Sequence, residues 1–348
     1  MVHDKRLAVQ GSAEVSGKIR DGLIGVYDGK SKKGYAPYNP KKANQDAMVM
    51  TEDAATQSLL LCVMDGHGEF GDKVSQDLKA SWPGMLFKHP KFADDATVPE
   101  ALSETILQAE AKMLKKMQGN ADFSGTTFVA CVIRGTTLWS ANVGDSRITC
   151  GERKPDGSGY VARNITDDHK PDSPGEKERI LAKGGRVFAV QYDDGIDGPQ
   201  RVWLGNMDIP GLAMARSLGD TIAHSAGVIS EPEIRVETID PEKMAFLVVA
   251  SDGLWEFMTD QDVVDQVAAG HGKAPQQLVG ELVETANQLW LKEEEVRALS
   301  HFFQYFSSLS LSFSLSLSLY ICIRRSSALF FFLCTSFLIV ALFVLSAR

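Results

Sequence analysis

Three aspartates in this sequence stand at the end of an apolar run and next to a glycine. With the runs that precede them, they are Asp65 after 59–64, Asp145 after 137–143 and Asp252 after 245–251. A carboxylate at the end of a buried strand is costly unless a cation or hydrogen-bond donors meet it. Ligand sets made only of oxygen suit hard divalent cations such as Mg²⁺ or Mn²⁺. A neighbouring glycine leaves room for the ion, water and substrate, so the pattern predicts a metal site.

Two further side chains extend this set toward phosphoryl chemistry. Asp46 precedes the apolar stretch "AMVM", and His67 stands two residues after Asp65. Two hard ions about 3.5–4 Å apart can clamp the attacking and leaving oxygens of a displacement at phosphorus. A histidine beside them can donate a proton to the leaving oxygen. One Asp-Gly pair alone is usually only a turn, and a lone histidine is usually structural, so the argument depends on their combination.

The elements that must position these residues are strands and long helices in irregular order. Strands are expected over 59–64, 127–133, 137–143 and 245–251. The second and third are separated by Arg134-Gly135-Thr136, a short link that predicts a hairpin. Hairpins and long helices without regular strand–helix–strand alternation favour an α+β fold with antiparallel sheets.

Two helices are expected from the spacing of apolar residues. Thr97 with Glu100 three residues later matches a capping box, which predicts a helix start. Apolar residues then recur at helical spacing from Val98 to Met117, and a second such face covers 278–290. Both faces are expected to be buried in the core and to carry no function.

Composition narrows the class of protein. The 348 residues are 44% hydrophobic and 23% charged, with a formal charge of −9. The last part, 298–348, contains three arginines and no acidic residue, so residues 1–297 carry −12. Such an acidic body disfavours nucleic-acid binding. Five widely spaced cysteines predict reduced thiols rather than disulfides or a zinc site, and the N-terminal residues lack the apolar segment of a signal peptide.

Eight motifs, in order, resemble the PPM/PP2C family of metal-dependent protein serine/threonine phosphatases. The resemblance covers residues from about 22 to 296, and part of it is similar to the plant and protist branches. The motifs are "NQD" (44–46), "VMDGHG" (63–68), "SGTT" (124–127), "ANVGDSR" (141–147), "DHKPDSPGEKERILAKGGRV" (168–187), "GLAMARSLGD" (211–220), "EPEI" (231–234) and "ASDGLWEFM" (250–258).

The resemblance implies a role for each residue of the predicted metal site. Asp65 would bridge two metal ions, and the Gly66 carbonyl would bind one of them. Asp252 would ligate the second ion, and Asp145 would share a looser third site with Asp252. The cofactors would be Mg²⁺ or Mn²⁺, two ions or three.

It also implies the residues that handle water, proton and phosphate. Asp46, with Gln45 beside it, would orient a metal-bound water, and His67 would be the general acid. Lys41 stands where the family has a phosphate-binding arginine. A lysine keeps the positive charge but lacks the bidentate fork of arginine.

The fold implied by the resemblance is a four-layer α-β-β-α sandwich, two antiparallel sheets between helix pairs, with metals in the cleft between the sheets. We expect a polar segment over 1–21, a phosphatase domain over 22–297 and a separate tail over 298–348. Residues from about His169 to Pro210 would include the flap, the segment beside the cleft that shapes substrate choice.

The family pattern breaks after the long helix that ends near Val296. A further strand normally opens there with an Asp-Asn or Asp-Asp pair followed by Thr, and its first Asp is a metal ligand. Asp265 is the last aspartate of this chain, so we expect that ligand and the last strand to be missing. Glu293, Glu294 or Glu295 could stand in for the ligand.

The tail itself has two interpretations. Residues 309–319 alternate Leu or Phe with Ser, and residues 328–345 are 18 apolar or small residues without charge. That run just reaches the length of a membrane-spanning helix, which predicts a C-terminal anchor. The second interpretation is that the tail is an alternatively spliced or mispredicted end of the chain, such as translated intron.

Three functions are compatible with these features. The leading one is a phosphatase in which metal-bound hydroxide attacks phosphoserine or phosphothreonine in phosphoprotein substrates. The second is a catalytically weak, membrane-held pseudophosphatase that binds phosphoproteins, motivated by the missing aspartate and Lys41. The third is a hydrolase of small phosphoesters. We expect a monomer in the cytoplasm or nucleus, or on a membrane through residues 328–345.

Overall fold

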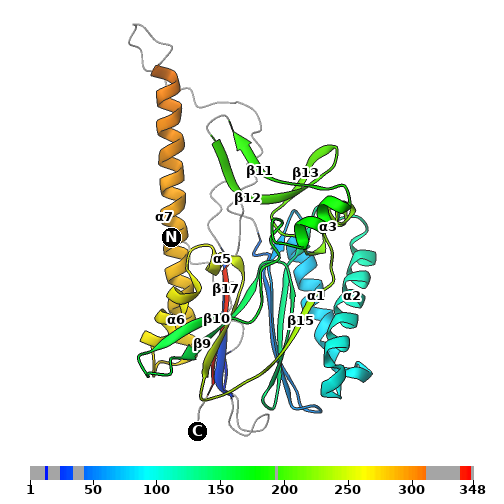
Figure 1. Cartoon of the computed structure of the whole chain (residues 1–348), viewed down its shortest axis with the longest axis vertical. Coiled ribbons are helices and arrows are strands. Elements are labelled where there is room, and N and C mark those ends of the chain that lie inside the picture. The colour runs from blue at the N-terminus through cyan, green and yellow to red at the C-terminus, as the bar shows by residue number, and fades with distance from the viewer. Residues whose placement is uncertain (1–11, 15–23, 34–42, 193–194, 311–337, 346–348) are drawn as a thin grey trace.

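The protein is described by a computed structural model over residues 12–14, 24–33, 43–192, 195–310 and 338–345. Lys41 and residues 311–337, which hold most of the alternating Leu/Ser stretch, lie outside the described residues. Two packed antiparallel sheets form the centre (Figure 1).

The first sheet has five strands and contains the run that ends at Asp65. In spatial order its strands are β15 (Glu233–Thr238), β8 (Thr137–Val143), β7 (Phe128–Arg134), β4 (Ser58–Met64) and β3 (Ala47–Asp53). The predicted hairpin is confirmed, because β7 and β8 pair from Arg134 with Thr137 onward. Every residue of β4 is buried, as expected for a central strand covered on both faces.

The second sheet has six strands and contains the run that ends before Asp252. In order they are β1 (Ser12–Glu14), β2 (Ile24–Lys32), β17 (Leu338–Leu345), β16 (Met244–Ala250), β9 (Arg147–Arg153) and β10 (Tyr160–Asn164).

Helices cover the outer faces and complete four layers. Helices α1 (Gly71–Phe87) and α2 (Val98–Met117) pack on the five-stranded sheet. Helices α5 (Asp252–Trp255), α6 (Asp260–Ala269) and α7 (Pro275–Ser310) pack on the six-stranded sheet, on the opposite side of the molecule (Figure 1). Strand β4 shows how the layers join: Leu60 and Cys62 face α1 and α2, whereas Leu61 and Val63 face the other sheet. The predicted four-layer sandwich is confirmed.

Two local predictions had different outcomes. Cys62, Cys131 and Cys150 are buried free thiols, as expected. Thr97 precedes α2 but does not cap it through its side chain, because its hydroxyl donates to the Lys91 carbonyl at 2.7 Å. Glu100 pairs with Lys91 instead, at 2.6 Å, so the predicted capping box is wrong although the helix is present.

The expectation that the last strand is missing is also wrong. Strand β17 lies between β2 and β16, with Ala341 opposite both Gly29 and Val249. Residues 338–345 therefore do not belong to a membrane-spanning helix, and 328–337 lie outside the described residues. Among the helices that the structure describes, none is both long and apolar enough to cross a bilayer. A uniformly apolar run has no periodicity to separate helix from strand, and an inner strand of a covered sheet needs such a run.

Two small sheets and several short helices complete the described fold. The flap sheet consists of β11 (Arg186–Tyr192), β12 (Gly195–Leu204) and β13 (Met207–Leu212), preceded by α3 (Glu176–Ala182). A second small sheet orders β14 (Leu218–Gly219), β6 (Gly125–Thr126) and β5 (Gly66–His67), and α4 (Thr221–Ser225) follows it. Short 3-10 turns, Pro90–Phe92 and Asp95–Thr97, lie between α1 and α2.

A buried ion-pair network fixes the base of the flap. Glu176 on α3 accepts hydrogen bonds from Arg216 Nη2 at 2.7 Å and from Arg179 Nη2 at 2.8 Å. Burial alone would raise the pKa of Glu176, but the two arginines lower it to about 2. Arg216 also donates to the Glu231 carbonyl, so this carboxylate joins α3 to the segments on either side of β14.

Strand β17 leads to a first prediction. Ala341→Pro should lower the free energy of unfolding by about 3 kcal/mol or more, because proline removes a ladder hydrogen bond from an inner strand. Ala54→Pro, at an exposed position of the turn between β3 and β4, should leave it nearly unchanged. Urea unfolding of the full chain measures both. Equal stability of the Ala341→Pro variant and the unsubstituted chain would contradict the placement of β17.

Glu176 leads to a prediction about pH. Its pKa is about 2 in the folded chain against an ordinary value of 4.5. The ion pairs should therefore stabilise fully above pH 4.5 and lose their effect as the pH falls toward 2. The difference in unfolding free energy between the unsubstituted chain and Glu176→Gln should be up to about 3 kcal/mol at neutral pH. That difference should shrink between about pH 5 and about pH 3, and a constant difference would count against it.

Candidate active site

The predicted acidic residues stand at the ends of strands from both sheets. Asp46 directly precedes β3 and Asp65 directly follows β4; since Ala47 is opposite Met64, these two aspartates leave the sheet side by side. Asp145 follows β8 after one residue, and Asp252 opens α5 two residues after β16. All four are buried.

Backbone and hydroxyl groups hold Asp65 close to the Asp145 turn. The Asp65 N–H donates to Thr127 Oγ1 and the Thr127 N–H donates to the Asp65 carbonyl, both at 2.9 Å. Thr127 Oγ1 also lies 2.6 Å from Ser146 Oγ, next to Asp145. Three chain segments that are distant in sequence are thus tied together at this point.

The absence of a side chain at Gly66 allows close packing of the backbone. A Cβ at this position would lie 2.8 Å from the backbone carbon of Gly71 at the start of α1. The missing side chain therefore admits the backbone of Gly71, rather than leaving open room for an ion. Gln45 adds to this junction, since its Nε2 donates to the Gly68 carbonyl at 2.6 Å.

His67 is paired with an acid that the sequence did not indicate. Its Nε2 lies 2.6 Å from Asp220 Oδ2, and the imidazole is one-quarter exposed. Burial alone would lower the pKa of His67, but the charge and hydrogen bond of Asp220 and the charges of Asp145 and Asp252 raise it. These charges place the predicted metal ligands and the predicted proton donor in one neighbourhood.

The small sheet β14-β6-β5 aligns this pair across a glycine. Gly125 on β6 is opposite both His67 and Gly219. A Cβ on Gly125 would lie 2.7 Å from the Asp220 carboxyl carbon and from the Leu218 carbonyl oxygen. Only glycine at 125 leaves the space in which the carboxylate of Asp220 reaches His67.

A lysine lies among the carboxylates on the other side of the site. Lys170 Nζ donates to Asp145 Oδ2 at 2.7 Å and lies 3.9 Å from Asp168. Burial lowers the pKa of Lys170, but the charges of Asp145, Asp168 and Asp252 raise it well above its usual range. Burial and the charges of Asp252 and Asp145 raise the pKa of Glu256 to about 8. The carboxylates around Asp145 and Asp252 therefore carry more negative charge than the single ammonium of Lys170 neutralises.

His169 contacts the backbone of the turn that carries Asp145. Its Nδ1 accepts a hydrogen bond from the Gly144 N–H at 3.1 Å, and its Nε2 lies 3.4 Å from Glu233. The ring is buried, and burial lowers its pKa. An Nδ1 that accepts a hydrogen bond requires the neutral ring, so His169 holds the backbone beside Asp145.

The donor chemistry fits a hard divalent cation. The predicted ligands are all oxygens, and Asp145 Oδ1 is buried without a hydrogen bond from any residue that the structure describes. Among the residues that the structure describes, no three His, Cys, Asp or Glu side chains lie close enough together to hold one ion. Strand β17 carries no acidic residue, nor do the four residues before it, "CTSF". The expected late aspartate is thus absent although its strand is present.

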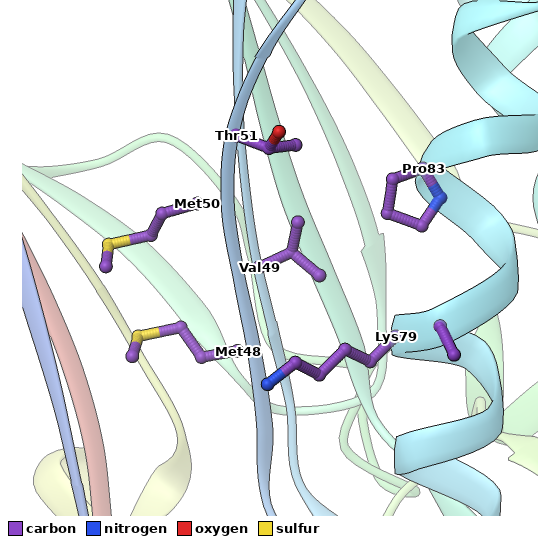
Figure 2. A pocket seen from close by; sticks show the side chains of 7 residues that line it. Met48, Val49, Met50, Thr51, Lys79 and Pro83 are labelled. Carbon is purple, nitrogen blue, oxygen red and sulfur yellow. The ribbon is translucent and has the colours of Figure 1, made fainter. Parts of the chain in front are cut away.

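A separate hollow lies between β3 and α1. Its volume is about 410 Å³. In Figure 2, Met48 and Met50 point to one side of β3, whereas Val49 and Thr51 point toward Pro83 on α1. Lys79 is the one charged side chain in its lining, so the hollow offers none of the carboxylates that define the site.

Comparison with known proteins agrees with this geometry. The family model described as Protein phosphatase 2C matches residues 27–289. A rice protein, Probable protein phosphatase 2C 64, is 36% identical over 277 residues, which cover 77% of this chain and 64% of the relative. Probable protein phosphatase 2C 72 of Arabidopsis thaliana is 35% identical over 261 residues, covering 72% and 77%. The chain thus spans slightly less than two-thirds of the rice relative.

Solved structures support the fold. The crystal structure of serine-threonine phosphatase 2C from Toxoplasma gondii superposes with a TM-score of 0.66 at 19% identity, covering 92% of this chain and 95% of that one. A C. elegans sex determining protein superposes with a TM-score of 0.64 at 18% identity. The matched family model covers most of the chain, and the chain belongs to the protein phosphatase 2C family.

Proposed function

We propose that this chain is a metal-dependent protein phosphatase that hydrolyses phosphoserine and phosphothreonine in protein substrates. The observation that carries the proposal is the meeting of strand-end aspartates from both sheets with the His67–Asp220 pair, in a chain of the protein phosphatase 2C family. Its relatives bear the names of phosphatases. The alternative of a membrane-held pseudophosphatase is not supported by these comparisons.

Asp65, the Gly66 carbonyl, Asp252 and Asp145 would hold Mg²⁺ or Mn²⁺. When bound, such ions supply an activated water nucleophile and offset the charge of the phosphoryl group. Asp46 would orient that water. Lys170 would give up its hydrogen bond to Asp145 when a metal ion binds, since the lysine and the ion would compete for the same carboxylate.

His67 would protonate the leaving serine or threonine oxygen. Its Nε2 is engaged by Asp220, so Nδ1 is the ring nitrogen that remains for the substrate. Alkoxide leaving groups gain most from a positioned proton donor. Lys41 remains a prediction for phosphate binding, and the boundaries at 22 and 297 remain predictions for the catalytic domain.

The absent late aspartate makes metal dependence the most informative property to measure. We expect the purified full chain to hydrolyse a phosphoserine peptide with Mn²⁺ or Mg²⁺, to stop on addition of EDTA, and to recover when metal is restored. Asp65→Asn should reduce the rate to that of the protein-free solution, because the bridging charge is lost. Rates are measured by phosphate release.

Two outcomes would oppose the proposal. Activity of the full chain no higher than that of Asp65→Asn would contradict a phosphatase. Hydrolysis of glycerol phosphate but not of phosphopeptides would instead favour the small-phosphoester hydrolase. The matched control is Asp156→Asn, an exposed aspartate in the loop between β9 and β10, which should leave the rate unchanged.

A further inference from the structure

Helix α2 carries a buried carboxylate that the reaction above does not use. Glu110 is 7% exposed and lies among the buried apolar residues of α2. Its Oε1 accepts hydrogen bonds from the Gly219 N–H at 3.0 Å and from Ser230 Oγ at 2.7 Å. A buried carboxylate is tolerated where donors satisfy it, and these donors lie 109 and 120 residues away along the chain.

One donor, Gly219, directly precedes Asp220, and the other, Ser230, follows helix α4. Gly219 has a φ of +95°, and Asp220 has φ +44° and ψ +47°, the left-handed region. That conformation is less favourable than the right-handed one for any residue with a Cβ, although single aspartates adopt it more readily than most residues, and surrounding contacts stabilise it. The contacts around it include hydrogen bonds from the Asp220 N–H to the Ser124 carbonyl at 3.0 Å and from the His224 N–H to the Asp220 carbonyl at 3.1 Å. The Glu110–Gly219 hydrogen bond adds a contact from α2.

We propose that Glu110 is a positioning residue for His67. By holding the Gly219 N–H, it keeps Asp220 in the left-handed conformation and so keeps the Asp220 carboxylate against His67 Nε2. Glu110 touches neither substrate nor metal, and it acts through the turn 218–220. The inference rests on the proposed function only in that it assigns His67 the role of proton donor.

The hydrogen bonds to Glu110 agree with an acceptor role. Burial and the charge of Glu231 raise the pKa of Glu110, whereas the hydrogen bonds from Gly219 and Ser230 and the nearby His224 favour its ionised form. His224 is itself on α4, directly after the turn, and its Nε2 lies 3.2 Å from the Ser217 carbonyl. The Glu110 carboxylate thus faces Gly219 on β14 and His224 and Ser230 after it.

A purely structural role predicts a different outcome from a positioning role. Loss of a structural contact would lower the folded fraction and reduce the turnover of every substrate equally. Loss of a positioning contact would selectively slow substrates whose leaving oxygen needs a proton. A phosphoserine peptide has such a leaving group, whereas an aryl phosphate such as p-nitrophenyl phosphate leaves as a stable anion.

The first experiment compares these two substrates in the full chain with Mn²⁺. Glu110→Ala should lower kcat for the phosphoserine peptide about tenfold, while kcat for p-nitrophenyl phosphate changes less than about twofold. Glu110→Gln should restore the ratio, because its side-chain oxygen can still accept from Gly219. Glu104→Ala, an exposed glutamate on the same helix, should change neither rate. An equal loss on both substrates would overturn the inference.

Ser230→Ala covers the case in which Glu110→Ala does not fold. It removes the other hydrogen bond to Glu110 Oε1, so we expect the same selective loss at a smaller size, about threefold. An unchanged substrate ratio in folded Ser230→Ala, together with misfolding of Glu110→Ala, would mean that Glu110 only supports the fold, which overturns the inference.

A second measurement does not depend on activity. In the metal-free full chain, the proton on His67 Nε2 should give a downfield NMR signal because it is shared with Asp220, and Asp220→Asn identifies that signal by its loss. Glu110→Ala should lose or shift the signal, and its persistence would overturn the inference. A chain that shows this coupling but hydrolyses neither substrate would refute the proposed function and leave the positioning role standing.

Discussion

The hydrogen bond between His67 and Asp220 sets the geometry on which the rest of the site depends. It joins residues 153 positions apart at 2.6 Å. The two side chains can meet only because Gly125, opposite both His67 and Gly219, has no side chain. The strand register of the small sheet β14-β6-β5 therefore determines that the side chains of His67 and Asp220 meet.

The two large sheets position the acidic residues of the site. Strand β4 is buried on both faces and delivers Asp65 and His67 from its end, while β16 delivers Asp252 from the other sheet. The apolar core between the sheets fixes the distance between these strand ends, because close-packed interiors resist displacement. Carboxylates that would repel one another in a looser chain are thus held together, and Lys170 offsets part of their charge.

Much of this arrangement could be predicted from local sequence. An acidic residue that ends an apolar run marks a strand end, which located Asp65, Asp145 and Asp252. The paired acid Asp220 could not be found this way, although it ends a recognised motif, because its role depends on a strand that is distant in sequence. Glu110 lies beside the apolar stripe of α2 but is not part of it, and nothing in its neighbours along the sequence distinguishes it from a solvent-facing glutamate. Strand β17 lies within the run 328–345, whose length fits a membrane helix, and a run of apolar residues carries no periodicity that would separate strand from helix.

The most direct test of the central claim is the effect of Gly125→Ala on leaving-group dependence. Its Cβ would collide with the Asp220 carboxylate, so the ratio of kcat for a phosphoserine peptide to kcat for p-nitrophenyl phosphate should fall about tenfold or more. Gly84→Ala, on α1 with no atom within 4 Å of the added Cβ, should leave the ratio unchanged. A folded Gly125→Ala chain with the ratio of the unsubstituted protein would contradict the account.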